Sequence, residues 1–457
     1  MPSNTASRGL AAAAWALTLG LGEAQTVKSP TPPMGWNSYN RYNCFPNEAI
    51  IRQNAQGLVD LGFAGLGYDI VTVDCGWPSR DRDAQGRLQW NETLFPSGPV
   101  ELGDFIHGLG LQFGLYSGAG YLQCGSSDIP ASLGYEDIDA QSFAEWGGDS
   151  LNIGLGALSY EEERFHFGFW SLMKSPLFIG GVMDRAEIPA ESLKIMSNEE
   201  AIAINQDPLA KAAELVIRYT EEEWDIWAGE LSGGRKALGI ANWKNETQTV
   251  NVDLSLIGVA SAKTRDVWAH ANGAIAGTQE VKLAPHELRL LVLSDIEETA
   301  APKEADYYSI VNATLAGGAR LVDCQPDECA PVQKKAGNIG GDASVTFRGV
   351  SAPSDGALRI GVDFINYDYH HTIGDWESNS RNLTVSVNQA DGKRWAFPLA
   401  GGDWFETGRL LIELDGFVAG NENEVVFTAP TQGRFAPDLA NSSIEMNDEG
   451  SVVAEGT

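Results

Sequence analysis

One carboxylate stands out by its position in the sequence. Asp74 ends the segment 69–74 (DIVTVD), whose almost wholly apolar run is typical of a parallel strand buried on both faces. Loops at the carboxyl ends of such strands build the binding and active sites of barrel proteins, so Asp74 is a candidate to accept hydrogen bonds from a ligand. The alternative is an acid that serves only the turn. Trp36 and Tyr116 end two other apolar runs and are aromatic candidates, although each also fits a core position.

Other reactive residue types have a structural explanation. His166 lies between two phenylalanines on an expected helix, where a packed histidine is more common than a catalytic one. The glutamates at 161–163 open that helix and suit its dipole. The six histidines are scattered, with His370-His371 the only adjacent pair, so no metal site is predicted. No G-x-G-x-x-G follows a strand, and no cofactor is predicted.

The elements that must position Asp74 alternate between strand and helix. Strand ends fall near residues 36, 75, 117 and 150, with helical patterns between them. A repeat of this kind predicts a TIM barrel or an open doubly wound sheet. After position 150, Ser159 and Glu162 form an S-x-x-E capping box that starts another helix, and 177–179 is a further buried strand.

The rest of the chain changes to an alternation of period two. Residues 210–295 predict an antiparallel β-sandwich, in which Val250 and Val252 alternate with polar residues. Residues 296–305 have the composition of a linker, and 306–430 predict a second β-sandwich. Residues 436–457 are acidic and poor in apolar groups, which predicts a disordered tail.

The start of the chain and its sequons indicate export, and its charge excludes some classes of partner. Residues 1–24 have the pattern of a signal peptide cleaved before Gln25, and no apolar run is long enough for a membrane span. The net charge of −31 argues against a nucleic acid or an anionic membrane surface as partner. We therefore expect a secreted, extracellular glycoprotein. Its candidate glycosylation sites are the N-x-S/T sequons at Asn91, Asn245, Asn312, Asn382 and Asn441.

The five cysteines allow two disulfides. Cys324 and Cys329 are five positions apart and could close a small loop, and Cys44 and Cys75 could pair across neighbouring elements. Cys124 is then left unpaired.

Several motifs resemble the α-galactosidases of glycoside hydrolase family 27. The resemblance implies an eightfold barrel over 28–209, followed by the antiparallel sandwich. Residues 306–430, with the segment 414–417 and the aromatics Tyr367, Tyr369 and Trp376, have a looser likeness to an appended carbohydrate-binding sandwich, although a core role fits these aromatics better. The motifs of the main resemblance are 31–39 (TPPMGWNSY), 73–77 (VDCGW), 135–140 (YEDIDA), 174–177 (KSPL) and 203–208 (AINQDP).

The resemblance gives the candidate site residues a role. It implies a retaining glycosidase that removes terminal α-D-galactose from oligosaccharides and polysaccharides by double displacement. Asp74 would hydrogen-bond the galactose hydroxyls, while Trp36 and Tyr116 would contact the sugar. Cys75 stands where the family often has a second aspartate, which weakens one sugar contact.

The barrel nevertheless looks interrupted. It spans about 180 residues, against ~250 for a typical (β/α)8 barrel, so roughly a hundred residues are missing. The family patterns around the nucleophile and the acid/base do not occur, and Asp149 in Asp-x-Leu fits either side of the gap. The family partner of Cys124 also falls in the gap.

Three interpretations follow from this gap. The first is an α-galactosidase-type chain that has lost its catalytic residues and is inactive. The second is a non-catalytic carbohydrate-binding protein that uses residues 306–430 and Asp74. In the third, the gap stems from an error in gene prediction or splicing.

Overall fold

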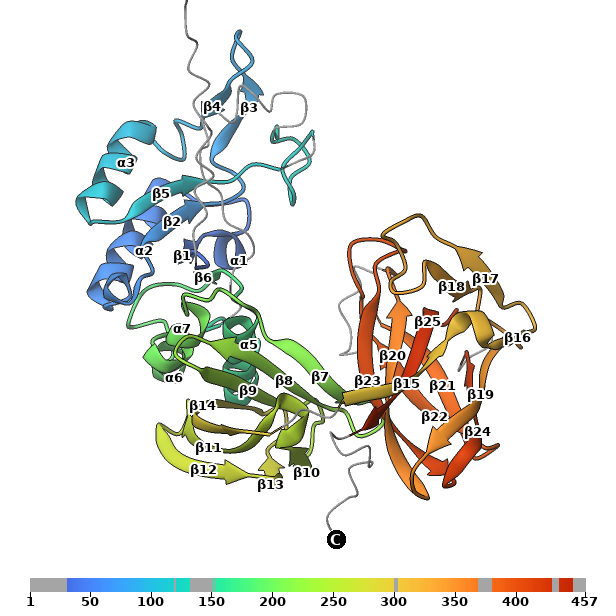
Figure 1. The fold of residues 1–457 in the computed structure, drawn as a ribbon. Helices are drawn as coiled ribbons and strands as arrows, with labels where there is room; N and C mark the ends of the chain where they lie inside the picture. Colours follow the sequence, from blue (N-terminus) through green and yellow to red (C-terminus); the bar gives the residue numbers. More distant parts are fainter. Residues whose placement is uncertain are drawn as a thin grey trace, which may run out of the picture.

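The computed structural model describes residues 31–118, 121–131, 151, 153–299, 303–368, 380–429 and 435–446. It has three parts, which Figure 1 colours from blue to red along the chain. The first combines a parallel sheet with helices, and the other two are antiparallel β-sandwiches. None of the helices within these described ranges has both the length and the apolar character needed to cross a membrane. The expected signal peptide, Asp149, Tyr369, Trp376 and the His370-His371 pair lie outside the described residues.

A four-stranded parallel sheet forms the core of the first part. Its order is β5-β2-β1-β6, with β1 at Met34–Asn37, β2 at Ile70–Val73, β5 at Gln112–Leu115 and β6 at Leu177–Ile179. Gly35 pairs with Ile70 on one side and Phe178 on the other. A Cβ at Gly35 would lie 2.2 Å from the carbonyl oxygen of Ile70, so only glycine fits this position.

One further residue extends this sheet beyond β6. Leu151 forms a parallel bridge to Ile179, and its N–H donates to the Phe178 carbonyl over 2.5 Å. Helix α5 (Tyr160–Leu172) follows Leu151 and leads into β6, which makes a βαβ unit. Leu151 therefore takes the position in the sheet that directly precedes β6 along the chain, and we place the interruption between β5 and Leu151.

The described part of the barrel is thus an open sheet with β5 at one edge and Leu151 at the other. This confirms the expectation of an incomplete TIM-type barrel. The expected capping box is also present, because Ser159 accepts from the Glu162 backbone and Glu162 accepts from the Ser159 backbone. The other helices are α1 (Tyr39–Tyr42), α2 (Glu48–Asp60), α3 (Gly98–Gly108), α6 (Ala190–Met196) and α7 (Glu199–Asn205), and a hairpin of β3 (Pro78–Arg82) and β4 (Leu88–Trp90) follows β2.

The first sandwich follows α7. One sheet has the order β12-β11-β14-β9-β8-β7, and the other pairs β10 with β13. Val250 and Val252 are buried as their alternation predicts. The strands are β7 (Glu214–Tyr219), β8 (Trp224–Leu231), β9 (Arg235–Asn242), β10 (Gln248–Asp253), β11 (Val259–Asp266), β12 (Ala271–Ala276), β13 (Thr278–Leu283) and β14 (Leu288–Glu298).

The second sandwich has its own core. A sheet of β23-β20-β25-β18-β17, with β15 paired to β25, faces a sheet of β16-β19-β24-β21-β22. Aromatic side chains such as Trp395 and Phe427 fill the space between them. The strands are β15 (Lys303–Ser309), β16 (Thr314–Ala316), β17 (Arg320–Asp323), β18 (Lys334–Gly337), β19 (Ser344–Ala352), β20 (Gly356–Ile365), β21 (Arg381–Val387), β22 (Lys393–Phe397), β23 (Gly408–Phe417), β24 (Gly420–Thr428) and β25 (Asp438–Met446).

Two expected boundaries are wrong. The tail expected over 436–457 begins with β25, which lies between β20 and β18 and buries Leu439 and Ala440. The linker expected over 296–305 is shorter, because β14 runs to Glu298 and β15 begins at Lys303. In both places the neighbouring strands supply hydrogen bonds that a polar sequence alone does not reveal.

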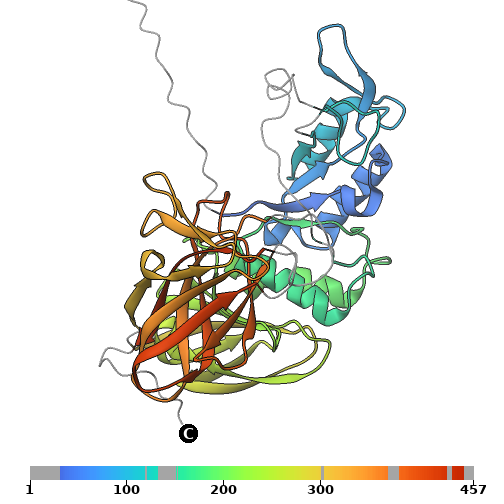
Figure 2. The same ribbon diagram turned by 90° about the vertical axis from the view of Figure 1, so that its right-hand side faces the viewer.

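The two sandwiches are in direct contact. Strands β7 and β23 pair in parallel at Ile217 and Leu411, and the Arg359 guanidinium donates to Asp253 over 2.8 Å. The Ala396 N–H donates to the Thr220 hydroxyl over 2.9 Å. In Figure 2 the second sandwich lies in front of the first, and the parallel sheet lies above them.

The position of β25 gives a testable boundary. A fragment of residues 303–446 is expected to unfold in one cooperative transition in urea, followed by circular dichroism. A fragment of 306–430 is expected to show none, because it lacks the strand between β20 and β18. Equal cooperativity in both fragments would contradict this role of β25.

Candidate functional site

Asp74 is held at the carboxyl end of the parallel sheet. It directly follows β2, and its Oδ2 accepts a hydrogen bond from the Asn37 side-chain amide over 2.9 Å. Its Oδ1 accepts from the Cys75 N–H over 2.7 Å, while its own N–H donates to the Ser38 hydroxyl over 2.9 Å. The half-buried carboxylate is therefore fixed by the ends of β1 and β2, and it stays partly open to a ligand.

Tyr116 lies at the same end of the sheet. It follows β5, and its backbone carbonyl accepts from the Trp77 indole over 2.7 Å. Burial raises the pKa of the Tyr116 phenol, and the negative charge of Asp74 adds to this rise. Tyr116 consequently stays protonated at neutral pH and can donate a hydrogen bond close to Asp74.

Trp36 belongs to the core in this structure. Its side chain has no exposed surface, and its indole N–H donates to the Gly181 carbonyl over 2.8 Å. The ring thus has no face on which a sugar can stack. The sequence left its role open because a strand buried on both faces has no polar side to indicate which residues point toward a ligand.

Asn37 also belongs to this site, although no pattern in the sequence singled it out. Asn37 directly follows Trp36 in the segment 31–39, and its buried amide is the side-chain partner of Asp74. The ends of β1, β2 and β5 thus contribute Asn37, Asp74 and Tyr116, and β6 is followed by two glycines. Asp74 is the single carboxylate in this set.

Both expected disulfides are present. Cys44 pairs with Cys75, and Cys324 pairs with Cys329. The first bond fixes the segment after β2, because Cys75 is fully buried next to Asp74. The Cys75 side chain is committed to this bond and is not a ligand for a sugar.

Cys124 is exposed and lies outside both disulfides. We expect alkylation of the unreduced protein to add one label, and alkylation after reduction to add five, because the chain has five cysteines. Intact-mass analysis makes this measurement. A monomer that takes no label before reduction would contradict the observed pairing.

His166 lies on α5, in a part of the fold that carries none of the residues around Asp74. Burial lowers its pKa to about 4, so the imidazole is neutral at physiological pH. Its ring centroid is 5.1 Å from that of Trp170. Its surroundings fit the packed histidine expected from the sequence.

The candidate glycosylation sites differ in accessibility. Asn245 and Asn312 are exposed, while Asn91 and Asn382 are half-buried. Asn441 is only 4% exposed, and its side chain bonds both the Asp363 carboxylate and the Ile310 N–H. A glycan on Asn441 is incompatible with this fold. This finding corrects the expectation that Asn441 is a glycosylation site.

Comparisons with known proteins show which family this chain is similar to. A family model described as Alpha galactosidase A matches residues 31–157, and one described as Alpha galactosidase C-terminal beta sandwich domain matches residues 221–293. α-Galactosidase D of Emericella nidulans is 28% identical, over 91% of this chain and 95% of the relative. The probable α-galactosidase D of Aspergillus oryzae is 29% identical, over 87% and 92%. By these matches the chain is similar to the α-galactosidases, as its sequence motifs predict.

Solved structures agree with this family at the level of the fold. α-Galactosidase I from Mortierella vinacea has a TM-score of 0.55 at 23% identity, and the match covers 61% of this chain and 99% of that chain. A putative α-galactosidase/melibiase from Bacteroides fragilis has a TM-score of 0.54 at 25% identity, with coverage of 58% and 79%.

The alignment with α-galactosidase D is much longer than this chain. It runs over 629 positions but includes only 91% of the 457 residues here, about 416. About 213 alignment positions therefore have no residue in this chain. The shortfall of the barrel region from a typical barrel, about 180 against ~250 residues, accounts for roughly 70 of these positions.

Proposed function

We propose that this chain is a secreted member of the α-galactosidase family that retains part of a galactose-binding end and does not hydrolyse galactosides. The observation that carries the proposal is the open sheet, in which Leu151 lies directly beside β6 while β5 is an edge strand that pairs only with β2 among the described residues. The strands between them are those whose ends would complete the site.

The chemistry of retaining glycosidases explains the expected loss of activity. They need two carboxyl groups about 5–5.5 Å apart, one as nucleophile and one as acid/base. The ends of β1, β2, β5 and β6 supply only Asp74, whose oxygens are bound to Asn37 and the Cys75 N–H. Asp74 is thus arranged to accept hydrogen bonds, and the covalent step lacks its second group.

The relatives support galactose as the sugar. The similar proteins are named α-galactosidases, and the solved structure of the Saccharomyces cerevisiae enzyme contains raffinose. By this likeness the ligands of the chain are α-galactoside oligosaccharides or polysaccharides. Asp74 can accept and Tyr116 can donate hydrogen bonds, a pair suited to sugar hydroxyls, while Asn37 holds the Asp74 carboxylate in place.

Binding of galactose to the full chain tests the retained half of the site. We expect weak, saturable binding by calorimetry or by ligand-observed magnetic resonance, and its loss in Asp74→Ala. Asp69→Ala, which removes an acid at the other end of the same strand, serves as the matched control. Equal binding by both variants would show that Asp74 has no part in it.

Export is supported by the two disulfides, which persist in oxidising compartments. The proposed signal peptide predicts that protein recovered from the medium of a eukaryotic host begins at Gln25. N-terminal sequencing makes this measurement, and retention of the intact leader inside the cell would contradict export.

The second candidate, a carbohydrate-binding protein, draws support from one end of the second sandwich. Tyr367 is 40% exposed and Phe405 is 38% exposed, and the Tyr367 and Trp404 rings meet edge to face with centroids 6.5 Å apart. Exposed aromatics of this kind are common in sugar-binding sites. Retardation of the chain in polysaccharide-containing gels, lost in Tyr367→Ala, would favour this function.

A further inference from the structure

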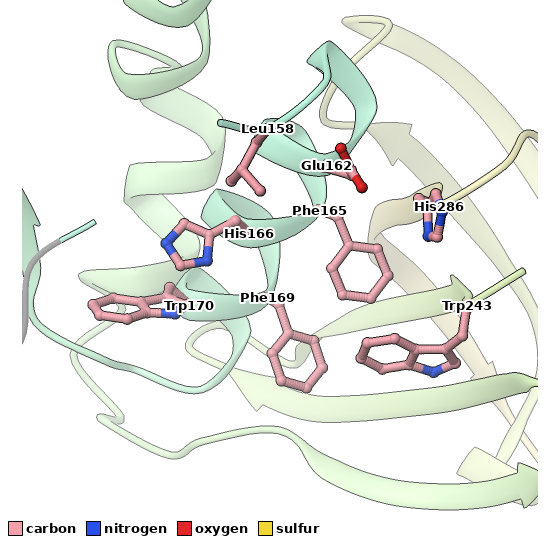
Figure 3. A pocket seen from close by; sticks show the side chains of 8 residues that line it. All are labelled: Leu158, Glu162, Phe165, His166, Phe169, Trp170, Trp243 and His286. Carbon is pink, nitrogen blue, oxygen red and sulfur yellow. The ribbon is translucent and has the colours of Figure 1, made fainter. Parts of the chain in front are cut away.

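A pocket of about 300 Å³ lies between α5 and the first sandwich. Figure 3 shows Phe165 and Phe169 on the side of α5 that faces Trp243, with Glu162 on the side of His286. The Phe165 and Trp243 ring centroids are 4.7 Å apart, so these two side chains contact each other and form one wall of the pocket. The lining residues are Leu158, Glu162, Phe165, His166, Phe169, Trp170, Trp243 and His286.

The sequon at Asn245 adjoins this pocket. Trp243 precedes Asn245 by two positions, so their Cα atoms are at most about 7 Å apart. The side-chain oxygen of Asn245 bonds Nε2 of His286, another pocket residue. Asn245 is exposed, and Thr247 completes the sequon in the loop between β9 and β10.

The loops that present these groups are held together. The Asn242 amide donates to the Glu246 carbonyl over 2.9 Å and to the Ala284 carbonyl over 2.7 Å. The His286 N–H donates to the Lys244 carbonyl over 3.1 Å. Asn245, Trp243 and His286 are consequently presented by a fixed pair of loops.

We infer that Asn245 carries an N-linked glycan whose first N-acetylglucosamine packs against Trp243 at the mouth of this pocket. The inference rests on the proposed export. In the transfer, the Asn245 amide nitrogen bonds to C1 of the sugar of a lipid-linked diphospho-oligosaccharide. The bond from C1 to the diphosphate oxygen breaks, and the diphosphate leaves with the amide proton.

The pocket matches the chemistry of that sugar. The C–H face of a pyranose packs on an indole ring and removes apolar surface from water. The N-acetyl and hydroxyl groups remain at the rim, where His286 and Glu162 offer hydrogen bonds. Asn312, the other exposed sequon, follows Ile310 and Val311 and has no aromatic residue at the corresponding position.

Two deglycosylating enzymes distinguish the effect of the first sugar from the effect of the rest of the glycan. The full chain is secreted from a host that adds high-mannose glycans, and glycopeptides are mapped by mass spectrometry. Endoglycosidase H leaves one N-acetylglucosamine on the asparagine, whereas peptide N-glycosidase F removes it. We expect the untreated and the endoglycosidase H forms to melt together, and the fully deglycosylated form to melt about 2–4 °C lower.

Hydrogen exchange and two variants complete the test. Amides of α5 are expected to exchange faster only after full deglycosylation. Asn245→Gln should reproduce the lower melting temperature without the aspartate that the amidase leaves, and Asn312→Gln should not. Removal of the glycan from folded protein keeps the test valid if Asn245→Gln is poorly secreted.

Different results would contradict the inference and the export proposal. If the endoglycosidase H form melts as low as the fully deglycosylated form, the first sugar does not pack on Trp243. If Asn312 is occupied and Asn245 is not, export holds and this inference fails. If neither sequon is occupied in the secreted protein, this inference fails while export holds. If no protein is secreted, the export proposal fails, and this inference fails with it.

Discussion

The purified chain is expected to hydrolyse a chromogenic α-galactoside no faster than buffer does. Glycosidases accelerate their reactions by at least about 10⁶-fold, and this acceleration depends on a pair of carboxyl groups. Asp74 alone at the described strand ends can bind a sugar hydroxyl but cannot supply both nucleophile and proton donor. Release of nitrophenol from nitrophenyl α-galactoside, followed over hours at high protein concentration, measures the rate.

A restored chain provides the control for this assay. The segment that α-galactosidase D has and this chain lacks is inserted ahead of Leu151, where the sheet is interrupted. We expect turnover in the restored protein and its loss when Asp74→Ala is added. Clear turnover by the unrestored chain would contradict the proposal, because a carboxylate such as Asp149 would then have to act with Asp74.

Replacing Asp225 by alanine is expected to destabilise the first sandwich by about 3–5 kcal/mol, because it removes the carboxylate that forms an ion pair with a buried guanidinium. Asp225 is fully buried, and Arg218 is 5% exposed. Their side chains form two hydrogen bonds, of 2.9 and 2.8 Å. The Trp243 indole also donates to Asp225 over 2.9 Å. Urea denaturation of the full chain measures the free energy of unfolding.

An exposed ion pair in the same sandwich is the matched control. Lys263 and Asp295 are 2.6 Å apart, but their side chains are 71% and 68% exposed. Asp295→Ala is therefore expected to change the free energy of unfolding by less than about 0.5 kcal/mol. Similar losses in Asp225→Ala and Asp295→Ala would contradict the assigned role of burial.

Local patterns predicted most of the elements. The run 69–74 became β2, the alternation around Val250 became β10, and Ser159 caps α5 as its spacing indicates. Such signals depend on residues close together in the chain, so they survive without knowledge of the tertiary structure. Strand β25 has no comparable signal, because its pairing partners rather than its polar sequence make it a strand.

The site was predictable only in part. Asp74 is at the strand end where the apolar run places it, whereas Trp36 is buried and Asn37 was overlooked. The sequence also left open on which side of the gap the segment 149–151 lies, since its Asp-x-Leu pattern fits more than one barrel strand. The bridge from Leu151 to Ile179 resolves it through a contact between distant segments.

The pairing of β1 with β6 has a consequence for how this chain is made. Met34 and Leu177 are neighbours in the sheet although 143 positions separate them in the chain. During synthesis, β1, β2 and β5 leave the ribosome well before β6, so one side of β1 waits without a partner. Contacts of such long sequence separation form slowly. The β1–β6 pairing is therefore expected to be the last step in assembling the sheet, and the unpaired side of β1 is a site for chaperone binding until then.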